Sequence, residues 1–387
     1  MKVLHICLGN FYVDNYSYQE NMLPKFHKEL GLDVEILTSL VSFDSTGKPC
    51  LLKEGGHYIN EHGIPVTRLE YKNSFISSKL RQYKGTYEAL RRSNPSIIFI
   101  HNCQFLDIIH VKAYVKRNPD IKVYVDNHAD FSNSARNFLS YNILHKIIWR
   151  KCAHLIEPYT TKFYGVLPAR VDFLKNVYKL PEEKVELLVM GADDEKVKEA
   201  KNPNIKKEIR KKYNIKPDDF LIVTGGKIDY AKKQTLLLMQ AVKNINKENV
   251  KLIIFGSVVN ELKEKMNALV DGEKVQYIGW IPANETYNHF AASDLVVFPG
   301  RHSVFWEQAV GTGLPCIFKY WEGTTHVDLG GNCEFLYEDS VDEIYEVLLS
   351  IIKDKDKLDK MRSNAEAKGI QYFSYKEISS KAIDVQI

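Results

Sequence analysis

Short apolar runs alternate with longer segments of helical periodicity along the first half of the chain. The runs are rich in β-branched and aromatic residues, which favours buried strands. The predicted strands are Val3–Cys7, Val34–Thr38, Ile97–His101, Val123–Asp126 and Val185–Val189, and the predicted helices are Tyr18–Leu30, Ser77–Arg92 and Ala135–Lys151. This alternation of strands and helices predicts a parallel, doubly wound sheet.

The same pattern starts again after a charged, turn-rich stretch at residues 191–217. The second series has predicted strands at Phe220–Thr224, Leu252–Phe255, Val275–Ile278, Leu295–Phe298 and Cys316–Phe318, and predicted helices at Lys232–Ile245, Glu261–Val270, Val304–Gly311 and Val341–Ile352. We therefore expect an α/β chain with two domains, residues 1–190 and 191–365, and a segment at 366–387 that packs back on the first domain. Doubly wound sheets bind ligands outside the carboxyl ends of their strands, so we expect the site in an interdomain cleft.

The composition is that of an ordinary globular protein. The 387 residues are 44% hydrophobic and 26% charged, enough for two buried cores. The net charge is +4, and residues 1–190 carry 25 Lys and Arg against 19 Asp and Glu. This small basic excess is compatible with an anionic acceptor or a membrane surface, but it is too weak to predict nucleic-acid binding.

Several features argue against a secreted or metal-binding protein. The six cysteines form no Cys-x-x-Cys pair, the residues after Met1 form a predicted strand and not a signal peptide, and no run of about 18 apolar residues occurs. The Asp-x-Asp at 354–356 lies in a lysine-rich stretch away from any predicted strand end. We therefore expect a cytoplasmic protein without a bound metal or other cofactor.

The clearest chemical signal is a glycine pair followed by cations. Gly225 and Gly226 end a predicted strand, and Lys227 and Lys232 follow at the opening of a helix. Glycines let a polyanion approach the backbone, a helix N-terminus offers unpaired N–H groups, and lysines supply charge to phosphate oxygens. The pattern indicates a diphosphate site. The alternative is a solvated lysine cluster, although the helix dipole disfavours cations there.

A second signal is Glu307, which lies just inside the predicted helix after the strand Leu295–Phe298 and is followed by Gly-x-Gly-x-Pro at 311–315. A carboxylate in this place can accept two hydrogen bonds from a ribose diol. The alternative is an acidic residue that only complements the helix dipole.

Together these motifs resemble the donor site of the retaining glycosyltransferase family 4, which has the GT-B fold of two Rossmann-like domains. The resemblance rests on Gly-Lys-x(4)-Lys and on Glu-x-x-x-Gly-x-Gly-x-Pro about 75 residues later. It implies that Lys227 and Lys232 bind the nucleotide diphosphate and that Glu307 binds the ribose. The residues implied beside the phosphate and the nucleobase are Gly226, Gly256 and Trp280.

In the first domain the resemblance implies roles for a histidine and a glycine at strand ends. His128 follows the strand Val123–Asp126 and would contact the transferred sugar near its anomeric centre. Gly9 follows the first strand and would belong to a loop facing the donor. Taken without the resemblance, His128 indicates a structural histidine and Gly9 a tight turn.

One departure concerns the donor sugar. The family usually has two glutamates separated by seven residues, and Pro299 stands where the first would be. The loop that follows is about four residues shorter than the common pattern. We expect His302 and Ser303 to contact the donor sugar in place of the missing carboxylate.

The segment Ile143–Lys151 has apolar residues at helical spacing with basic neighbours. One interpretation is contact with an anionic membrane surface. The other is an ordinary helix that packs its apolar stripe on the sheet.

The resemblance therefore implies a metal-independent, retaining enzyme. It would move a sugar from a nucleoside diphosphate sugar to a glycan or lipid-linked acceptor, as in the synthesis of bacterial capsules and other surface polysaccharides. Lysines and a helix N-terminus can stabilise the leaving diphosphate without a metal. Two other functions stay open, a nucleotide-sugar epimerase or phosphorylase and a non-catalytic partner subunit of the same fold.

Overall fold

The computed structural model describes residues 1–44, 49–72 and 75–385. The chain divides into two compact units, Met1–Met190 with Ile378–Ile387, and Gly191–Glu377. The second boundary falls inside helix α16 (Tyr375–Ala382). Residues 366–377 therefore belong to the second unit, whereas the sequence led us to expect the whole C-terminal segment on the first domain.

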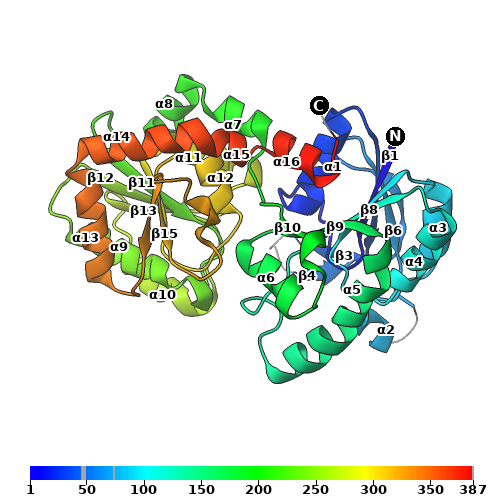
Figure 1. Cartoon of the computed structure of the whole chain (residues 1–387). Helices are drawn as coiled ribbons and strands as arrows, with labels where there is room; N and C mark the ends of the chain where they lie inside the picture. The colour runs from blue at the N-terminus through cyan, green and yellow to red at the C-terminus, as the bar shows by residue number, and fades with distance from the viewer. Residues whose placement is uncertain (45–48, 73–74, 386–387) are drawn as a thin grey trace. The chain divides into compact units, whose positions relative to one another are not determined.

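The first unit contains a parallel sheet with one antiparallel edge strand (Figure 1). Its strands are β1 (Lys2–Cys7), β2 (Asp33–Ser39), β5 (Gly56–Ile59), β6 (Pro65–Leu69), β7 (Ile97–His101), β8 (Lys122–Asn127), β9 (Thr160–Gly165) and β10 (Val185–Leu187). They follow the order β10-β9-β8-β7-β1-β2-β6-β5, and only the β5 pairing is antiparallel. A separate antiparallel pair is formed by β3 (Val41–Phe43) and β4 (Pro49–Leu51).

The helices of the first unit lie on the two faces of this sheet. They are α1 (Gln19–Glu29), α2 (Phe75–Lys79), α3 (Thr86–Ser93), α4 (Ile108–Arg117), the π-helix η1 (Ser140–Trp149), α5 (Arg150–Ile156) and α6 (Pro168–Asn176), with short 3-10 turns η2 (Glu157–Tyr159) and η3 (Glu182–Lys184). Side chains alternate along β1, so Leu4 and Ile6 join the apolar core with α3 to α6. His5 points to the opposite face, where it meets His27 of α1.

The prediction of one helix over Ser77–Arg92 is wrong. Helix α2 ends at Lys79 and α3 begins at Thr86, and the chain between them adopts left-handed backbone at Arg81 (φ 56°) and Gly85 (φ 75°). Helical hydrogen bonding cannot continue through that conformation. Strands β5, β6 and β9 were not predicted, because their runs are short or interrupted by polar residues.

The second unit contains a six-stranded sheet in which every pairing is parallel. Its strands are β11 (Phe220–Gly225), β12 (Val250–Phe255), β13 (Val275–Gly279), β14 (Leu295–Phe298), β15 (Cys316–Lys319) and β16 (Cys333–Leu336), in the order β13-β12-β11-β14-β15-β16. This is the doubly wound order, whose connections reverse direction between β11 and β14. Loops after these two strands are therefore where a ligand site is expected.

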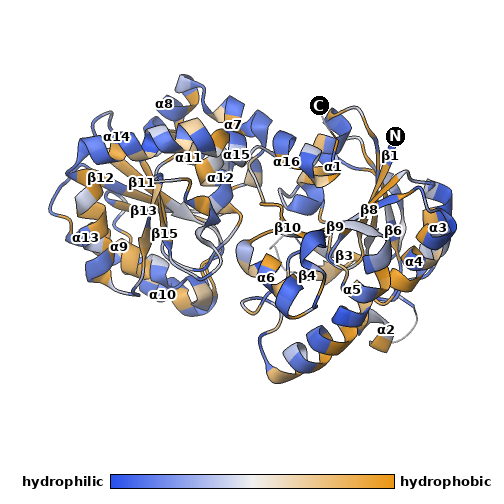
Figure 2. Cartoon of the chain, viewed as in Figure 1, coloured by the Kyte–Doolittle hydropathy of each residue, from blue (hydrophilic) through white to orange (hydrophobic). Residues whose placement is uncertain are grey.

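The helices of the second unit cover both faces of its sheet (Figure 1). They are α7 (Asp194–Ala200), α8 (Pro203–Lys212), α9 (Gln234–Asn244), α10 (Asn260–Asn267), α11 (Thr286–Ala292), α12 (Phe305–Gly311), α13 (Val341–Ile352), α14 (Lys355–Asn364), the π-helix η7 (Ala365–Gly369) and α15 (Ile370–Tyr372), with 3-10 turns η4 (Tyr230–Lys232), η5 (Ala283–Glu285) and η6 (Thr325–Val327). Figure 2 shows the predominantly hydrophilic colouring of α8 on the outside of this unit.

The stretch at 191–217, which we expected to be turn-rich, instead forms α7 and α8. Asp193 caps α7 by accepting hydrogen bonds from the N–H groups of Glu195 and Lys196. Asn202 caps α8 in the same way, and Pro203 occupies its first position. These start signals were present in the sequence but were masked by the high charge of the segment.

Candidate functional site

Two loops of the second unit cross so closely that each requires a glycine. Gly226 follows β11 with φ 110°, and Gly256 follows β12 with φ 115°. A Cβ atom on Gly256 would lie 1.9 Å from the carbonyl oxygen of Gly226. These positions therefore need glycine for local backbone reasons. The crossing also leaves a bare backbone surface at the carboxyl end of the sheet.

Lys232 lies beside this bare backbone. It ends the 3-10 turn η4, and its Nζ atom is 3.4 Å from the place that a Cβ on Gly226 would occupy. Burial lowers the pKa of Lys232 to about 8, while nearby Asp229 acts to raise it and Arg301 to lower it. Lys227 is exposed on the same loop. The structure therefore brings Lys232, Gly226 and Gly256 together, with Lys227 at the solvent side.

Arg301 is a third cation that the sequence reasoning did not select. It lies in the short loop after β14, and its backbone N–H donates to the carbonyl of Ala231 at 3.3 Å. The signal that could have found it is its place after the strand next to β11, because neighbouring parallel strands bring their following loops together. Arg301 acts to lower the pKa of Lys232, so the two cations lie near one another.

Glu307 is fully buried near the start of α12, and two histidines bind one of its oxygens. Nε2 of His302 and Nε2 of His326 each lie 2.8 Å from Oε1. The other oxygen, Oε2, is buried and has no hydrogen-bond partner among the described residues. Burial raises the pKa of Glu307, but the two histidines outweigh it and lower the pKa to about 2. The carboxylate is therefore ionised, with Oε1 held by two histidines and Oε2 left to accept a hydrogen bond from a ligand.

His326 was missed from the sequence, and His302 has a contact that was not expected. His326 belongs to η6, after β15, and its Nδ1 is buried without a hydrogen-bond partner in the described part of the chain. His302 binds Glu307 and packs edge-on against Trp306, with ring centroids 5.0 Å apart. The Oγ atom of Ser303 is likewise buried and unpartnered among the described residues. Several polar atoms around Glu307 are thus available for a ligand.

Trp280 directly follows β13, and 70% of its surface is exposed. A large exposed aromatic ring at a strand end is suited to stacking on a planar ligand.

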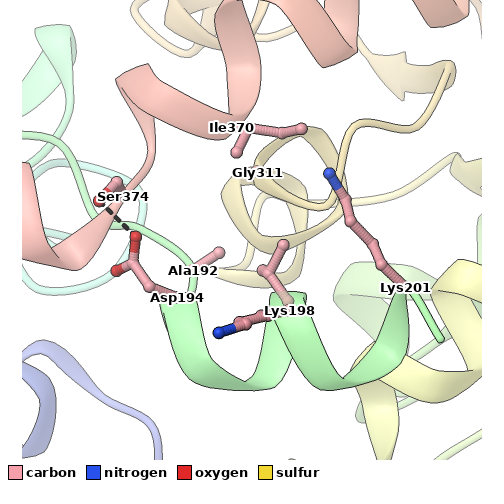
Figure 3. A pocket seen from close by; sticks show the side chains of 8 residues that line it. Ala192, Asp194, Lys198, Lys201, Gly311, Ile370 and Ser374 are labelled. Atoms are coloured by element: carbon pink, nitrogen blue, oxygen red, sulfur yellow. Dashed lines mark hydrogen bonds between the residues drawn. The ribbon is translucent and has the colours of Figure 1, made fainter.

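The second unit also has a pocket of about 250 Å³ that contains none of the predicted site residues (Figure 3). Its lining includes the exposed amines of Lys198 and Lys201, and the Ser374 hydroxyl donates to Asp194 at its edge. The pocket is lined by Ala192, Asp194, Val197, Lys198, Lys201, Gly311, Ile370 and Ser374.

In the first unit, His128 lies at the carboxyl end of β8 against two acidic groups. Its Nε2 is 3.3 Å from Oδ1 of Asp126 and 3.8 Å from Oε1 of Glu20, and 16% of its side chain is exposed. The backbone N–H of His128 donates to Oδ1 of Asn102 at 2.9 Å. Burial lowers the pKa of His128, but Asp126 and Glu20 outweigh it, so the net shift is upward.

Asn102 also explains Gly9. A Cβ atom on Gly9 would lie 1.9 Å from the carbonyl oxygen of Asn102, which itself has a positive φ of 64°. The close approach of these two loops requires glycine without any ligand. Gly9 therefore allows the close packing of the loop that contains Asn102, and the side chain of Asn102 binds the backbone of His128.

A line of buried histidines continues from Asp126 into the core. Nδ1 of His101 lies 2.8 Å from Oδ2 of Asp126, and Nε2 of His101 lies 3.0 Å from Nδ1 of His5. Nε2 of His5 is 2.9 Å from Nδ1 of His27, whose Nε2 is 2.9 Å from the carbonyl oxygen of Ser379 in α16. All three histidines and Asp126 are completely buried. The sequence had predicted His5 only as part of a strand. It had left two roles open for His101 at the end of its strand, a structural one or a part in shaping the site beside His128.

Two groups of side chains place three candidate metal-ligand atoms within 4.8 Å of one another in the described part of the chain. They are Glu20, His101 and His128, and His302, Glu307 and His326. Both ring nitrogens of His101 are already hydrogen-bonded. The 2.8 Å contacts of Glu307 are hydrogen-bond distances. Hydrogen bonding thus accounts for His101 and for Oε1 of Glu307, whereas Nε2 of His128 has no hydrogen-bond partner among the described residues. The absence of a metal stays a prediction.

Residues 205–368 match the family model of group 1 glycosyl transferases. The match covers most of the second unit but less than half of the chain. No curated protein sequence matches the chain significantly. Among the residues that the structure describes, we find no helix with the length and apolar character needed to cross a bilayer.

Solved structures resemble the chain over nearly its full length. A glycosyltransferase from Rickettsia africae superposes with a TM-score of 0.70 at 16% identity, covering 99% of this chain and 97% of that one. HepE from Anabaena, in complex with UDP, gives 0.69 at 16% identity and 98% coverage of both. WaaG, a glycosyltransferase involved in lipopolysaccharide biosynthesis, gives 0.67 at 14% identity, covering 98% and 99%. Both units thus have the Rossmann-like domains of a GT-B fold, and residues 205–368 of the second match the model of group 1 glycosyl transferases.

Proposed function

From this group 1 domain and GT-B fold we propose that the chain transfers a sugar from a nucleoside diphosphate sugar. The observation that carries the proposal is the partly buried Lys232 beside the glycine crossing, with Arg301 nearby. A diphosphate beside Lys232 would stabilise its ammonium group against the cost of burial. HepE, which has the same fold, was crystallised with UDP. In the proposal, Lys227 contacts the diphosphate from the solvent side.

We assign the ribose to the open oxygen of Glu307. Oε1 is already bound by two histidines, so Oε2 is the atom left to accept a hydrogen bond from a ribose hydroxyl. Ser303 is a donor-sugar contact in this proposal, since its buried hydroxyl has no partner among the described residues. His302 acts on the donor through Glu307, which it holds in place. Trp280 would stack on the nucleobase.

We assign the donor sugar, near its anomeric carbon, to His128. The upward pKa shift of His128 favours an imidazolium, which can stabilise negative charge that develops on the leaving oxygen or on sugar hydroxyls. The cations of the second unit stabilise the leaving diphosphate without a metal in this scheme. We propose retention of configuration at the anomeric carbon, which NMR of the product linkage would test directly.

The acceptor is proposed to be a glycan or lipid-linked hydroxyl at the cytoplasmic face of a membrane, as in surface-polysaccharide synthesis. Helix η1 leaves Ile143, Leu144 and Ile147 exposed at 43%, 37% and 61%, so this part of its apolar surface does not pack on the sheet. Lys146 lies in the same segment, and orange and blue residues alternate along it (Figure 2). Apolar side chains beside cations are typical of segments that contact anionic bilayers.

Turnover of a panel of nucleotide sugars tests the function. The full-length protein is incubated with each donor and an extract of lipid-linked glycans, and products are separated by mass spectrometry. The proposal predicts a nucleoside diphosphate and a glycan heavier by one sugar. An isomerised nucleotide sugar would indicate an epimerase instead. Binding of donors with no turnover would indicate a non-catalytic subunit.

A further inference from the structure

The line of histidines in the first unit has a fixed direction because it ends on a carbonyl group. The carbonyl oxygen of Ser379 can only accept, so Nε2 of His27 must carry a proton. Each of the next two contacts, from His27 to His5 and from His5 to His101, joins two ring nitrogens and needs one proton between them. The final contact joins His101 to the carboxylate of Asp126 and needs one more.

Counting protons along this line gives an excess of one. Four hydrogen bonds in series need four protons, and three neutral imidazoles supply only three. The line from Ser379 to Asp126 therefore holds one proton more than neutral histidines with an ionised aspartate would provide. The distances, all between 2.8 and 3.0 Å, leave no contact that is too long for a hydrogen bond.

The excess proton has its lowest free energy on His101. His101 is the ring that faces Asp126, and a charge pair in a buried site is far more stable than an isolated buried imidazolium. Burial holds the pKa of His5 well below its usual range and lowers that of His27 to about 4. Burial acts to raise the pKa of Asp126, but the contacts with His101 and His128 outweigh it and hold this pKa below its usual range.

We infer that His5, His27 and His101 act as a proton-storing relay that keeps His101 cationic and so orients Asp126 toward His128. Oδ2 of Asp126 is bound by His101, and Oδ1 accepts the N–H of Asn102 at 3.2 Å. The only titratable ring left for Oδ1, among the described residues, is His128, at 3.3 Å. Nε2 of His128 is buried without a hydrogen-bond partner among the described residues, so its contact with Asp126 is an ion pair. In this proposal the nearby carboxylate favours a proton on Nε2 of His128 and leaves Nδ1 as the variable nitrogen.

Other groups near the relay do not supply this proton. Glu20 of α1 faces His128 and raises its pKa, while Arg170 of α6 lowers it. The Cys7 thiol of β1 lies near both Glu20 and Asp126, and burial raises its pKa so that it stays protonated. His101 is therefore a positioning residue for His128, and His5 and His27 hold it in that state.

Imidazole nitrogen NMR of the full-length protein tests the relay without any assay of transfer. The protein is labelled with 15N-histidine, and His5, His27 and His101 are assigned from single substitutions to Gln. At pH 8 we expect His5 and His27 as neutral rings protonated on Nε2, and His101 protonated on both nitrogens. A neutral His101, or a His27 protonated on Nδ1 alone, would overturn the inference.

The variant His101→Gln gives a second readout, since it removes the cation and leaves the carboxylate of Asp126 unbalanced. The pKa of His128 should then rise, because the nearby positive charge of His101, which disfavours a second imidazolium, has been lost. The control His145→Gln removes another buried histidine of the same unit, hydrogen-bonded to Ser134 and Tyr178, and should leave the pKa of His128 unchanged. An unchanged or lower pKa in folded His101→Gln would contradict the relay.

The link from the relay to catalysis rests on the proposed function. Transfer by His101→Gln should fall about ten-fold, with its pH profile displaced in step with the pKa of His128, while nucleotide affinity stays unchanged. If NMR shows the stored proton but the pH profile does not move, the relay stands and the role of His128 in transfer is wrong.

Discussion

Each unit buries a carboxylate among histidines, but the two carboxylates are left in different states. Asp126 of the first unit has both oxygens engaged, one by His101 and the other by Asn102 and His128. Glu307 of the second unit has two histidines on one oxygen and nothing, among the described residues, on the other. A saturated carboxylate can only orient its neighbours, whereas a half-open one can bind a ligand. In the proposed function, the first unit therefore contributes to the chemistry of transfer and the second recognises the nucleotide.

We expect the largest loss of transfer rate from substitutions in the second unit. Replacing Lys227 and Lys232 together by Ala removes two charge-assisted contacts to the diphosphate. At about 1.5 to 3 kcal/mol each, transfer should fall roughly a hundred- to ten-thousand-fold. Nucleotide affinity, measured by calorimetry, should fall with it. The control variant, Lys263→Ala with Lys265→Ala on α10, removes the same charge and should change neither the transfer rate nor the nucleotide affinity. Activity within a few-fold of wild type in the Lys227→Ala, Lys232→Ala variant would contradict the diphosphate assignment.

A substitution in the first unit should reduce transfer by a smaller factor and leave nucleotide affinity unchanged. His128→Ala should reduce transfer about a hundred-fold, because a misplaced reacting sugar loses most of the advantage of orientation. Its affinity for the free nucleoside diphosphate should match wild type, since the nucleotide contacts lie in the other unit. A parallel loss of affinity, transfer and thermal stability would show instead that His128 is a structural residue.

Nucleotide affinity should depend on pH through Lys232. Burial depresses the folded-state pKa of this lysine to about 8, so in the free protein its charge is present below pH 8 and lost above it. A bound diphosphate favours the charged form, so the affinity should weaken roughly ten-fold from pH 7 to pH 9. Lys232→Arg keeps its charge throughout and should abolish this dependence. The dependence is read from calorimetric titrations, and an equal slope in the variant would assign the proton to another group.

The smallest effect concerns the half-open carboxylate. Glu307→Gln should weaken nucleoside diphosphate binding about three- to ten-fold, and it should remove most of the preference over the 2′,3′-dideoxy analogue. His302→Ala should act in the same direction on free nucleotide and nucleotide sugar alike, because it acts through Glu307. A loss confined to the nucleotide sugar would instead show that His302 touches the sugar, as the sequence alone had suggested.

The doubly wound sheets could be predicted because their buried strands are continuous apolar runs. Leu295–Phe298 and Ile97–His101 were predicted with the bounds that the structure has. Edge strands such as β5 and β16 were not predicted, because a half-exposed strand lacks a continuous apolar run. The single helix predicted over Ser77–Arg92 failed at Arg81, where nothing in the residue type signals left-handed backbone.

The motif residues were predictable, but their partners were not. Lys232 and Glu307 could be selected because they stand at fixed distances from glycines in a familiar pattern. His326 lies 19 residues after Glu307 and meets it only through the neighbouring order of β14 and β15. The relay of His5, His27 and His101 depends likewise on strand register and on a helix from the far end of the chain. Such contacts follow from topology, which local patterns do not specify.

Thermal unfolding of the full-length protein with a panel of nucleoside mono- and diphosphates tests the central claim most directly. A diphosphate at about 100 times its dissociation constant adds about 2.7 kcal/mol to the free energy of unfolding. We predict a rise in Tm of several degrees with at least one nucleoside diphosphate, a much smaller rise with its monophosphate, and none in the Lys227→Ala, Lys232→Ala double variant. Stabilisation by no nucleoside diphosphate, or an equal rise in the double variant, would contradict nucleotide-sugar transfer at this site.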